Sequence, residues 1–270
     1  MAERYPEFSL ASKLRFALAL LRTSLKAAVA LRFAFGLQVV FMALNNWLYF
    51  SFWWFLLGRV PEIRGFSLPD VATMNGVVAS GFGIAVTFSG GVTRLARLID
   101  DGDLDTLLTQ PRATLPYALL SHSRASGIGD LVSGLVLLLV VGRGSLATLP
   151  WMLAAIALSA LAFIASGILF FSAAFWFGRW ESVAVKIWEL LITFSLYPEP
   201  LFGLRLRLVL FTLLPAGLTA FLPVALLRAP SLSSLFVACA ATLGYFAVAV
   251  WVFHRGLTRY SSGSRFGVWG

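Results

Sequence analysis

The sequence predicts an all-α integral membrane protein with six transmembrane helices. Of its 270 residues, 59% are hydrophobic and only 12% are charged, whereas charged residues make up about 25% of an average soluble domain. A soluble globule of this size cannot hide so much apolar surface from water. Several charge-free stretches also exceed the roughly 20 residues that a helix needs to cross the hydrocarbon core. With a single cysteine, the composition excludes a soluble enzyme, a disordered chain and a disulfide-stapled domain.

The expected spans follow the apolar stretches, near residues 33–57, 71–92, 125–142, 150–177, 183–203 and 232–253. The third span is less clean because it contains Asp130. The fifth contains Lys186 and Glu189, which are three residues apart and are placed to pair on one helix face. Glycines make the second span locally thin and should permit close helix packing; they are Gly76, Gly81, Gly83 and Gly90.

Residues 1–32 precede the first span and carry basic side chains among leucines and alanines, including Lys13, Arg22 and Lys26. This pattern is typical of an amphipathic helix that lies in the membrane interface with its cations near anionic headgroups. We therefore expect a cytoplasmic tail and an interfacial helix over residues 1–32.

The segment 205–228, before the last span, is apolar but is broken by Pro215, Gly217 and Pro223. Irregular backbone at membrane depth is tolerated only where it packs against protein. We expect a re-entrant pair of short helices here. A full crossing would instead give seven helices and move the C-terminus to the other side.

The loop charges predict the orientation. With both termini in the cytoplasm, the inner segments 1–32, 93–124, 179–186 and 254–270 hold 15 of the 21 lysines and arginines. This positive-inside asymmetry also accounts for the net charge of +9, so no nucleic-acid partner is expected. We expect a multi-pass protein of the cell's inner (cytoplasmic) membrane.

The inner loop 93–124 carries an acidic cluster around a short apolar pattern. Gly102 can end the preceding helix, and Pro111 ends the next one. Leucines at spacing i, i+3, i+4 form one stripe, and aspartates surround it. They are Leu104, Leu107 and Leu108, with Asp100, Asp101, Asp103 and Asp105. The stripe could rest on the membrane surface, but anionic headgroups repel the aspartates, which favours a protein partner.

Catalytic motifs are missing from the sequence. The lysines Lys13, Lys26 and Lys186 are followed by Leu, Ala and Ile, so no P-loop can form. The histidines His122 and His254 have no cysteine or carboxylate at metal-ligand spacing. We expect neither an enzyme nor a cofactor or metal site on this chain.

The string Gly102-Asp103-Leu104-Asp105-x-x-Leu108-x-x-Pro111 resembles the signature of ABC-2 type transporter permeases. The ending Gly256-Leu257-Thr258-Arg259-Tyr260-Ser261-Ser262-Gly263-Ser264 and the proline-broken 214–223 segment resemble the same family. The resemblance implies that residues 33–270 form an ABC-2 type transmembrane domain, the permease subunit of an ATP-binding cassette exporter of amphipathic or hydrophobic compounds. ATP and Mg would bind two copies of a separate ATPase subunit, and a second permease, identical or paralogous, would complete the transporter.

In that reading the segment 100–111 would be the coupling helix that docks in the ATPase. Trp180 and Glu181, on the next inner loop, would give a second contact. The alternative is a membrane scaffold or an intramembrane lipid-modifying enzyme, which would need converging polar residues such as Asp130, Glu189 and His122.

Polar side chains inside the first two spans are further candidates for a pathway or a dimer interface. Unpaired amides are costly in hydrocarbon, so these residues should face protein or a cavity. An interhelical hydrogen bond at the subunit interface is favoured over substrate contact. The candidates are Asn45, Asn46, Asn75 and Thr87.

Overall fold

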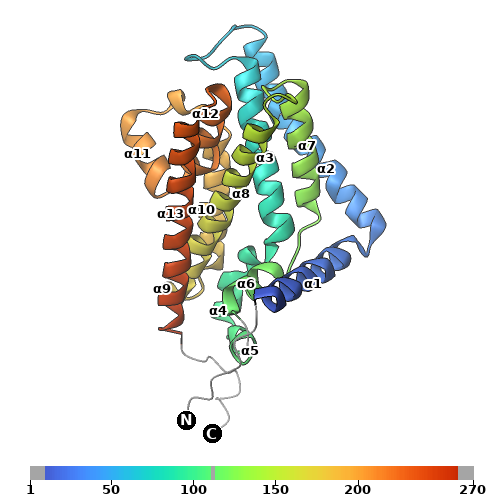
Figure 1. Cartoon of the computed structure of the whole chain (residues 1–270), viewed down its shortest axis with the longest axis vertical. Coiled ribbons are helices and arrows are strands. Elements are labelled where there is room, and N and C mark those ends of the chain that lie inside the picture. Colours follow the sequence, from blue (N-terminus) through green and yellow to red (C-terminus); the bar gives the residue numbers. More distant parts are fainter. Residues whose placement is uncertain (1–9, 111–112, 261–270) are drawn as a thin grey trace.

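The computed structural model describes residues 10–110 and 113–260, which form an elongated bundle of helices (Figure 1). Within these residues there is no strand, only an isolated bridge between Ile63 and Phe66. The all-α class is thus confirmed. The predicted helix end at Pro111 and the residues of the 256–264 ending after Tyr260 lie outside the described residues.

In the described part of the chain, four helices are long and apolar enough to cross a membrane: α2 (Arg32–Leu57), α3 (Leu68–Phe88), α8 (Leu149–Ser172) and α13 (Leu232–Leu257). They coincide with four of the expected spans, which confirms a multi-pass membrane protein. In α3 and α8, 78% and 67% of the most apolar window is buried inside the chain, against 6% in α2 and 17% in α13. The middle of the bundle is therefore α3 and α8, while α2 and α13 lie at its periphery.

Two shorter helices occupy the remaining expected spans, α7 (Ser126–Val140) and α10 (Glu181–Ser195). Each has 15 residues, or about 22 Å of helix against the roughly 30 Å of a hydrocarbon core. The helix α10 ends well before residue 203, because Pro198 cannot continue a helix and disfavours helical backbone at the residue before it. The total of six spans stays a prediction.

The segment after α10 forms a bent pair of helices. After the short turn η2 (Glu199–Leu201), α11 (Leu204–Thr212) meets η3 (Gly217–Phe221) and α12 (Leu222–Arg228) at a bend of 84°. The two ends of the segment reach one loop, since Arg64 donates to the Pro200 carbonyl and Arg228 to that of Gly65, both at 2.7 Å. The pair thus enters and leaves at the same end of the bundle (Figure 1).

Short helices gather at the opposite end of the bundle (Figure 1). They are η1 (Gly90–Arg94), α4 (Leu95–Asp100), α5 (Leu104–Leu108), α6 (Thr114–Leu120) and α9 (Ala174–Phe177). The expected amphipathic helix is α1 (Leu10–Val29), which lies across this end, and the rings of Phe16 and Tyr117 stack there at 5.8 Å. Its position in a membrane interface stays a prediction. We call this the α4–α5 end.

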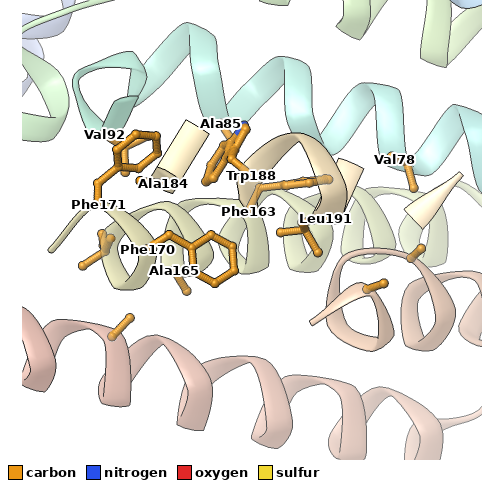
Figure 2. Packing of buried hydrophobic residues seen from close by; sticks show 14 of the residues in the cluster. Val78, Ala85, Val92, Phe163, Ala165, Phe170, Phe171, Ala184, Trp188 and Leu191 are labelled. Atoms are coloured by element: carbon orange, nitrogen blue, oxygen red, sulfur yellow. The ribbon is translucent and has the colours of Figure 1, made fainter. Parts of the chain in front are cut away.

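An aromatic cluster fixes α10 against α3 and α8. The ring centroid of Trp188 lies 6.2 Å from that of Phe163 and 5.9 Å from that of Phe171. Figure 2 shows these three side chains together. The Trp188 ring packs where α8 has Gly167, and a Cβ at that position would collide with it. A displacement of α10 must therefore displace α8 as well, because close-packed interiors transmit such movements.

Candidate functional site

The predicted coupling loop folds as two short helices joined by Gly102. This glycine has a φ of +79°, the left-handed conformation that costs glycine little. The helix α4 is anchored in the bundle, because Leu95, Ala96 and Ile99 are all buried. The sequence expectation that Gly102 separates two helices is therefore confirmed.

Two acidic residues of the predicted site brace α4 against the junction of α9 and α10. Asp100 accepts hydrogen bonds from the backbone N–H groups of Arg179 and Trp180, at 2.9 and 3.1 Å. Glu181 forms a two-point ion pair with Arg97, with N–O distances of 3.1 and 2.7 Å, and this pairing raises the pKa of Arg97. The structure thus joins the two loops that the sequence analysis predicted to be on the inner side.

Trp180 ties the same junction to α8. Its indole N–H donates to the carbonyl of Phe170 at 3.0 Å, and its ring stacks on Phe177 with centroids 4.8 Å apart. The backbone of Arg179 has a φ of +46°, which is unfavourable for a residue with a side chain. Asp100 therefore holds a strained turn in place.

The leucine stripe of α5 differs from the expectation. Leu104 is 0% exposed and belongs to the chain's own hydrophobic core, with Leu107 packed against that core, whereas Leu108 is 41% exposed. Leu104 therefore anchors α5 and is not available to a partner. Asp101 and Asp105 are half-buried. The exposed residues of this segment, which we call the coupling surface, are Asp103, Thr106, Leu108 and Thr109.

A cleft of about 540 Å³ opens between α2, α3, α7 and α10. Its volume falls in the range of about 300–1,000 Å³ that is typical of small-molecule sites. Three of the predicted polar residues, Asn45, Asn46 and Asn75, line this cleft together. Thr87 is not among the lining residues. It is buried further along α3, where its carbonyl accepts a hydrogen bond from Ser123 at 2.6 Å.

The amide of Asn46 connects α2 to α7 inside the cleft. It donates to Asp130 Oδ1 at 2.8 Å and to Ser133 Oγ at 2.9 Å. The favoured interhelical hydrogen bond is thus present, but it lies within one chain. Asn75 instead donates to the Val71 carbonyl of its own helix at 3.0 Å. No local pattern could pair Asn46 with Asp130, which is 84 residues away.

A second polar cluster, at the end of the bundle remote from α5, is centred on Asp70. Its Oδ1 accepts from Arg143 Nε at 2.6 Å and lies 3.2 Å from Arg228 Nε. Its Oδ2 accepts from the backbone and side chain of Ser67 in a capping box at the start of α3. Sequence reasoning missed this cluster, and the Ser-x-x-Asp spacing at 67–70 was the only local signal for it.

Long apolar helices with a cleft among them and a braced helical knob at one end define an all-α membrane protein. The sequence matches the ABC-2 family transporter protein over residues 43–264. The chain belongs to this family, as its resemblance predicted. The family consists of permease subunits that are generally not catalytic, with ATP hydrolysis on a partner ATP-binding subunit. None of the curated proteins compared with the chain matches it.

Proposed function

We propose that this permease subunit exports an amphipathic or hydrophobic compound and is driven by an ATPase that docks on the coupling surface. The observation that carries the proposal is the bracing of α4 and α5 at one end of the bundle. Leu104 anchors α5 in the core, while Asp100 and the Arg97–Glu181 pair fix α4 to the start of α10. A knob held in this way moves as one body with the helices above it.

The mechanical path from this knob leads to the cleft. The helix α10 begins at Glu181, which pairs with Arg97 of α4, and its Trp188 lines the cleft. A push on α5 that displaces α4 must displace the start of α10, because an ion pair and two backbone hydrogen bonds join them. Closure of the ATPase would thus change the shape of the cleft, which gives a physical route from ATP hydrolysis to transport.

The proposal includes two ATPase copies, each with ATP and Mg, and a second permease, identical or paralogous. It also places both termini in the cytoplasm and the α4–α5 end on the cytoplasmic side of the inner membrane. The scaffold or lipid-enzyme alternative needs Asp130, Glu189 and His122 to converge. Asp130 and Glu189 line the cleft, but His122 does not, which weighs against a shared reaction centre.

Leu108→Arg tests the docking. This leucine is exposed, so the change should leave the fold intact while it places a charge at the centre of the contact. Losing a central interface anchor typically costs about 2 kcal/mol or more, so we expect at least a tenfold loss of co-purified ATP-binding subunit. The measurement is co-purification of the co-expressed subunit with the tagged permease.

Leu146→Arg is the matched control, because Leu146 is a strongly exposed leucine in the loop between α7 and α8, at the other end of the bundle. It should retain full co-purification. If a correctly inserted Leu108→Arg variant binds the ATPase as well as Leu146→Arg does, docking at the coupling surface is refuted.

A further inference from the structure

Asp130 is a carboxylate inside the bundle with only half of its hydrogen-bonding capacity used. The residue is 3% exposed and lies in α7, facing the cleft. Its Oδ1 accepts from Asn46 at 2.8 Å, while its buried Oδ2 has no hydrogen-bond partner. Among the described residues, no lysine, arginine or histidine forms an ion pair with it.

A purely structural role does not account for this arrangement. The bond from Asn46 joins α2 to α7 through Oδ1 alone, and an asparagine or serine at position 130 would accept it equally well. An unpaired buried carboxylate oxygen carries a large desolvation cost whether the group is ionised or protonated. Buried ionisable residues within a membrane protein mark functional sites by default.

Other unpaired polar atoms border the same cleft. Asn75 donates its amide to Val71, which leaves its Oδ1 as an acceptor without a partner. The Nε1 of Trp188 is a donor without a partner. Three residues that line the cleft, Asp130, Asn75 and Trp188, therefore each carry a buried polar atom without a hydrogen-bond partner.

The remaining walls suit an apolar body. Phe82 and Trp188 line the cleft, and their ring centroids are 6.1 Å apart. Of the other charges at the cleft, Glu189 is neutralised by Lys186 at 2.7 Å. Arg124, in the turn before α7, also lines the cleft but is exposed, and among the described residues it forms no ion pair with Asp130. Asp130 is thus the buried charge that a ligand would have to satisfy.

We propose that the cleft between α2, α3, α7 and α10 binds an amphipathic organic cation, with its protonated amine on Asp130 and its apolar body against Phe82 and Trp188. An ammonium group supplies the donor that Oδ2 of Asp130 lacks, and aromatic faces attract cations. The claim that the cleft is the substrate site of an exporter rests on the proposed function. The claim that the cleft binds such a cation rests only on the residues that line it.

The test is a binding titration on the purified permease without any ATPase, in nanodiscs of phosphatidylcholine and phosphatidylglycerol. The probe is dansylcadaverine, a fluorescent lipophilic primary amine, and its N-acetylated form is a neutral analogue that differs at the amine alone. We expect the wild type to bind the amine at least about tenfold more tightly than the acetylated form, the factor typical of a charge-assisted hydrogen bond. Asp130→Asn should remove this preference.

Asp103→Asn is the matched control, because it neutralises an exposed carboxylate just before α5 that lies outside the cleft. It should change the affinity for the amine less than twofold. If Asp130→Asn does not fold, Ala79→Trp, which fills the cleft from α3, should abolish binding of both probes. Equal binding of the two probes by the wild type, or full affinity in a folded Asp130→Asn or Ala79→Trp variant, would overturn the proposal.

A primary amine also occurs on a lipid headgroup. A second set of nanodiscs therefore distinguishes a lipid amine from a free amine as the ligand. Nanodiscs containing phosphatidylethanolamine should reduce dansylcadaverine binding if a lipid amine occupies the cleft, and should leave it unchanged if the ligand is a free amine. Because no ATPase is present, a negative result here leaves the Leu108→Arg test untouched. Conversely, loss of docking would not alter the titration.

Discussion

At the scale of single residues, Asp70 is the point where three distant parts of the chain meet. Its carboxylate caps α3, pairs with Arg143 of the α7–α8 loop, and pairs with Arg228 at the end of α12. The Arg228 guanidinium also lies 4.3 Å from the ring centroid of Phe66 and donates to Gly65. The return of the bent helix pair to this end of the bundle is therefore held largely through one buried aspartate.

Asp70→Ala should lower the free energy of unfolding by about 1–3 kcal/mol. This is less than the full cost of breaking a buried ion pair, because both arginines are partly exposed. Unfolding of the variant and the wild type in mixed micelles measures this difference in free energy. Glu199→Ala is the control, because Glu199 pairs with Arg207 at a longer 3.6 Å and with both side chains about one-third exposed. A loss no greater than that of Glu199→Ala would show that Asp70 does not hold this end.

The sequence could reveal contacts between residues close in the chain but not those between distant ones. The Lys186–Glu189 pair was predicted from its spacing of three and is confirmed at 2.7 Å. The bonds from Asp70 to Arg143 and Arg228 link residues 73 or more positions apart, and no local pattern specifies them. The burial of Leu104 was missed for the same reason, since a helix stripe shows that one face is apolar but not what covers it.

At the scale of elements, the tight contact between α3 and α7 is made by facing glycines. Gly76 and Gly83 of α3 lie seven residues apart, and so do Gly127 and Gly134 of α7. A Cβ on Gly134 would lie 2.7 Å from the Gly76 carbonyl oxygen, and one on Gly83 would press on the Gly127 carbonyl. The prediction that glycines thin the second span for close packing is thus confirmed.

Gly134→Ala should destabilise the protein by about 1–3 kcal/mol, because the new methyl group meets backbone atoms that cannot move aside. Gly244→Ala is the matched change in α13, where nothing lies within 4 Å of the added Cβ. It should be neutral, or stabilising by up to about 1 kcal/mol through the higher helix propensity of alanine. The thermal unfolding midpoints of the two variants give the comparison, and equal midpoints would contradict the packing argument.

At the scale of the whole molecule, two ends of opposite character are separated by the long helices. One end carries the coupling surface and its bracing, and the other carries the loop 58–67, the α7–α8 loop and the return of the bent pair. The positions Leu146 and Ser231 both belong to this second end, whereas Thr106 belongs to the first. The structure shows which positions share an end of the bundle, and the positive-inside pattern predicts that the end with Thr106 is the cytoplasmic one.

Single cysteines in a Cys239→Ser background test this arrangement, since Cys239 is the chain's own thiol. A membrane-impermeant maleimide should label Leu146→Cys and Ser231→Cys in intact cells, and Thr106→Cys only after permeabilisation. Labelling of Ser231→Cys together with Leu146→Cys is required if the segment 205–228 re-enters. If Ser231→Cys reacts only after permeabilisation while Leu146→Cys reacts in intact cells, the segment crosses the membrane. The last helix would then run the other way and place the end of α13 outside, away from the ATPase.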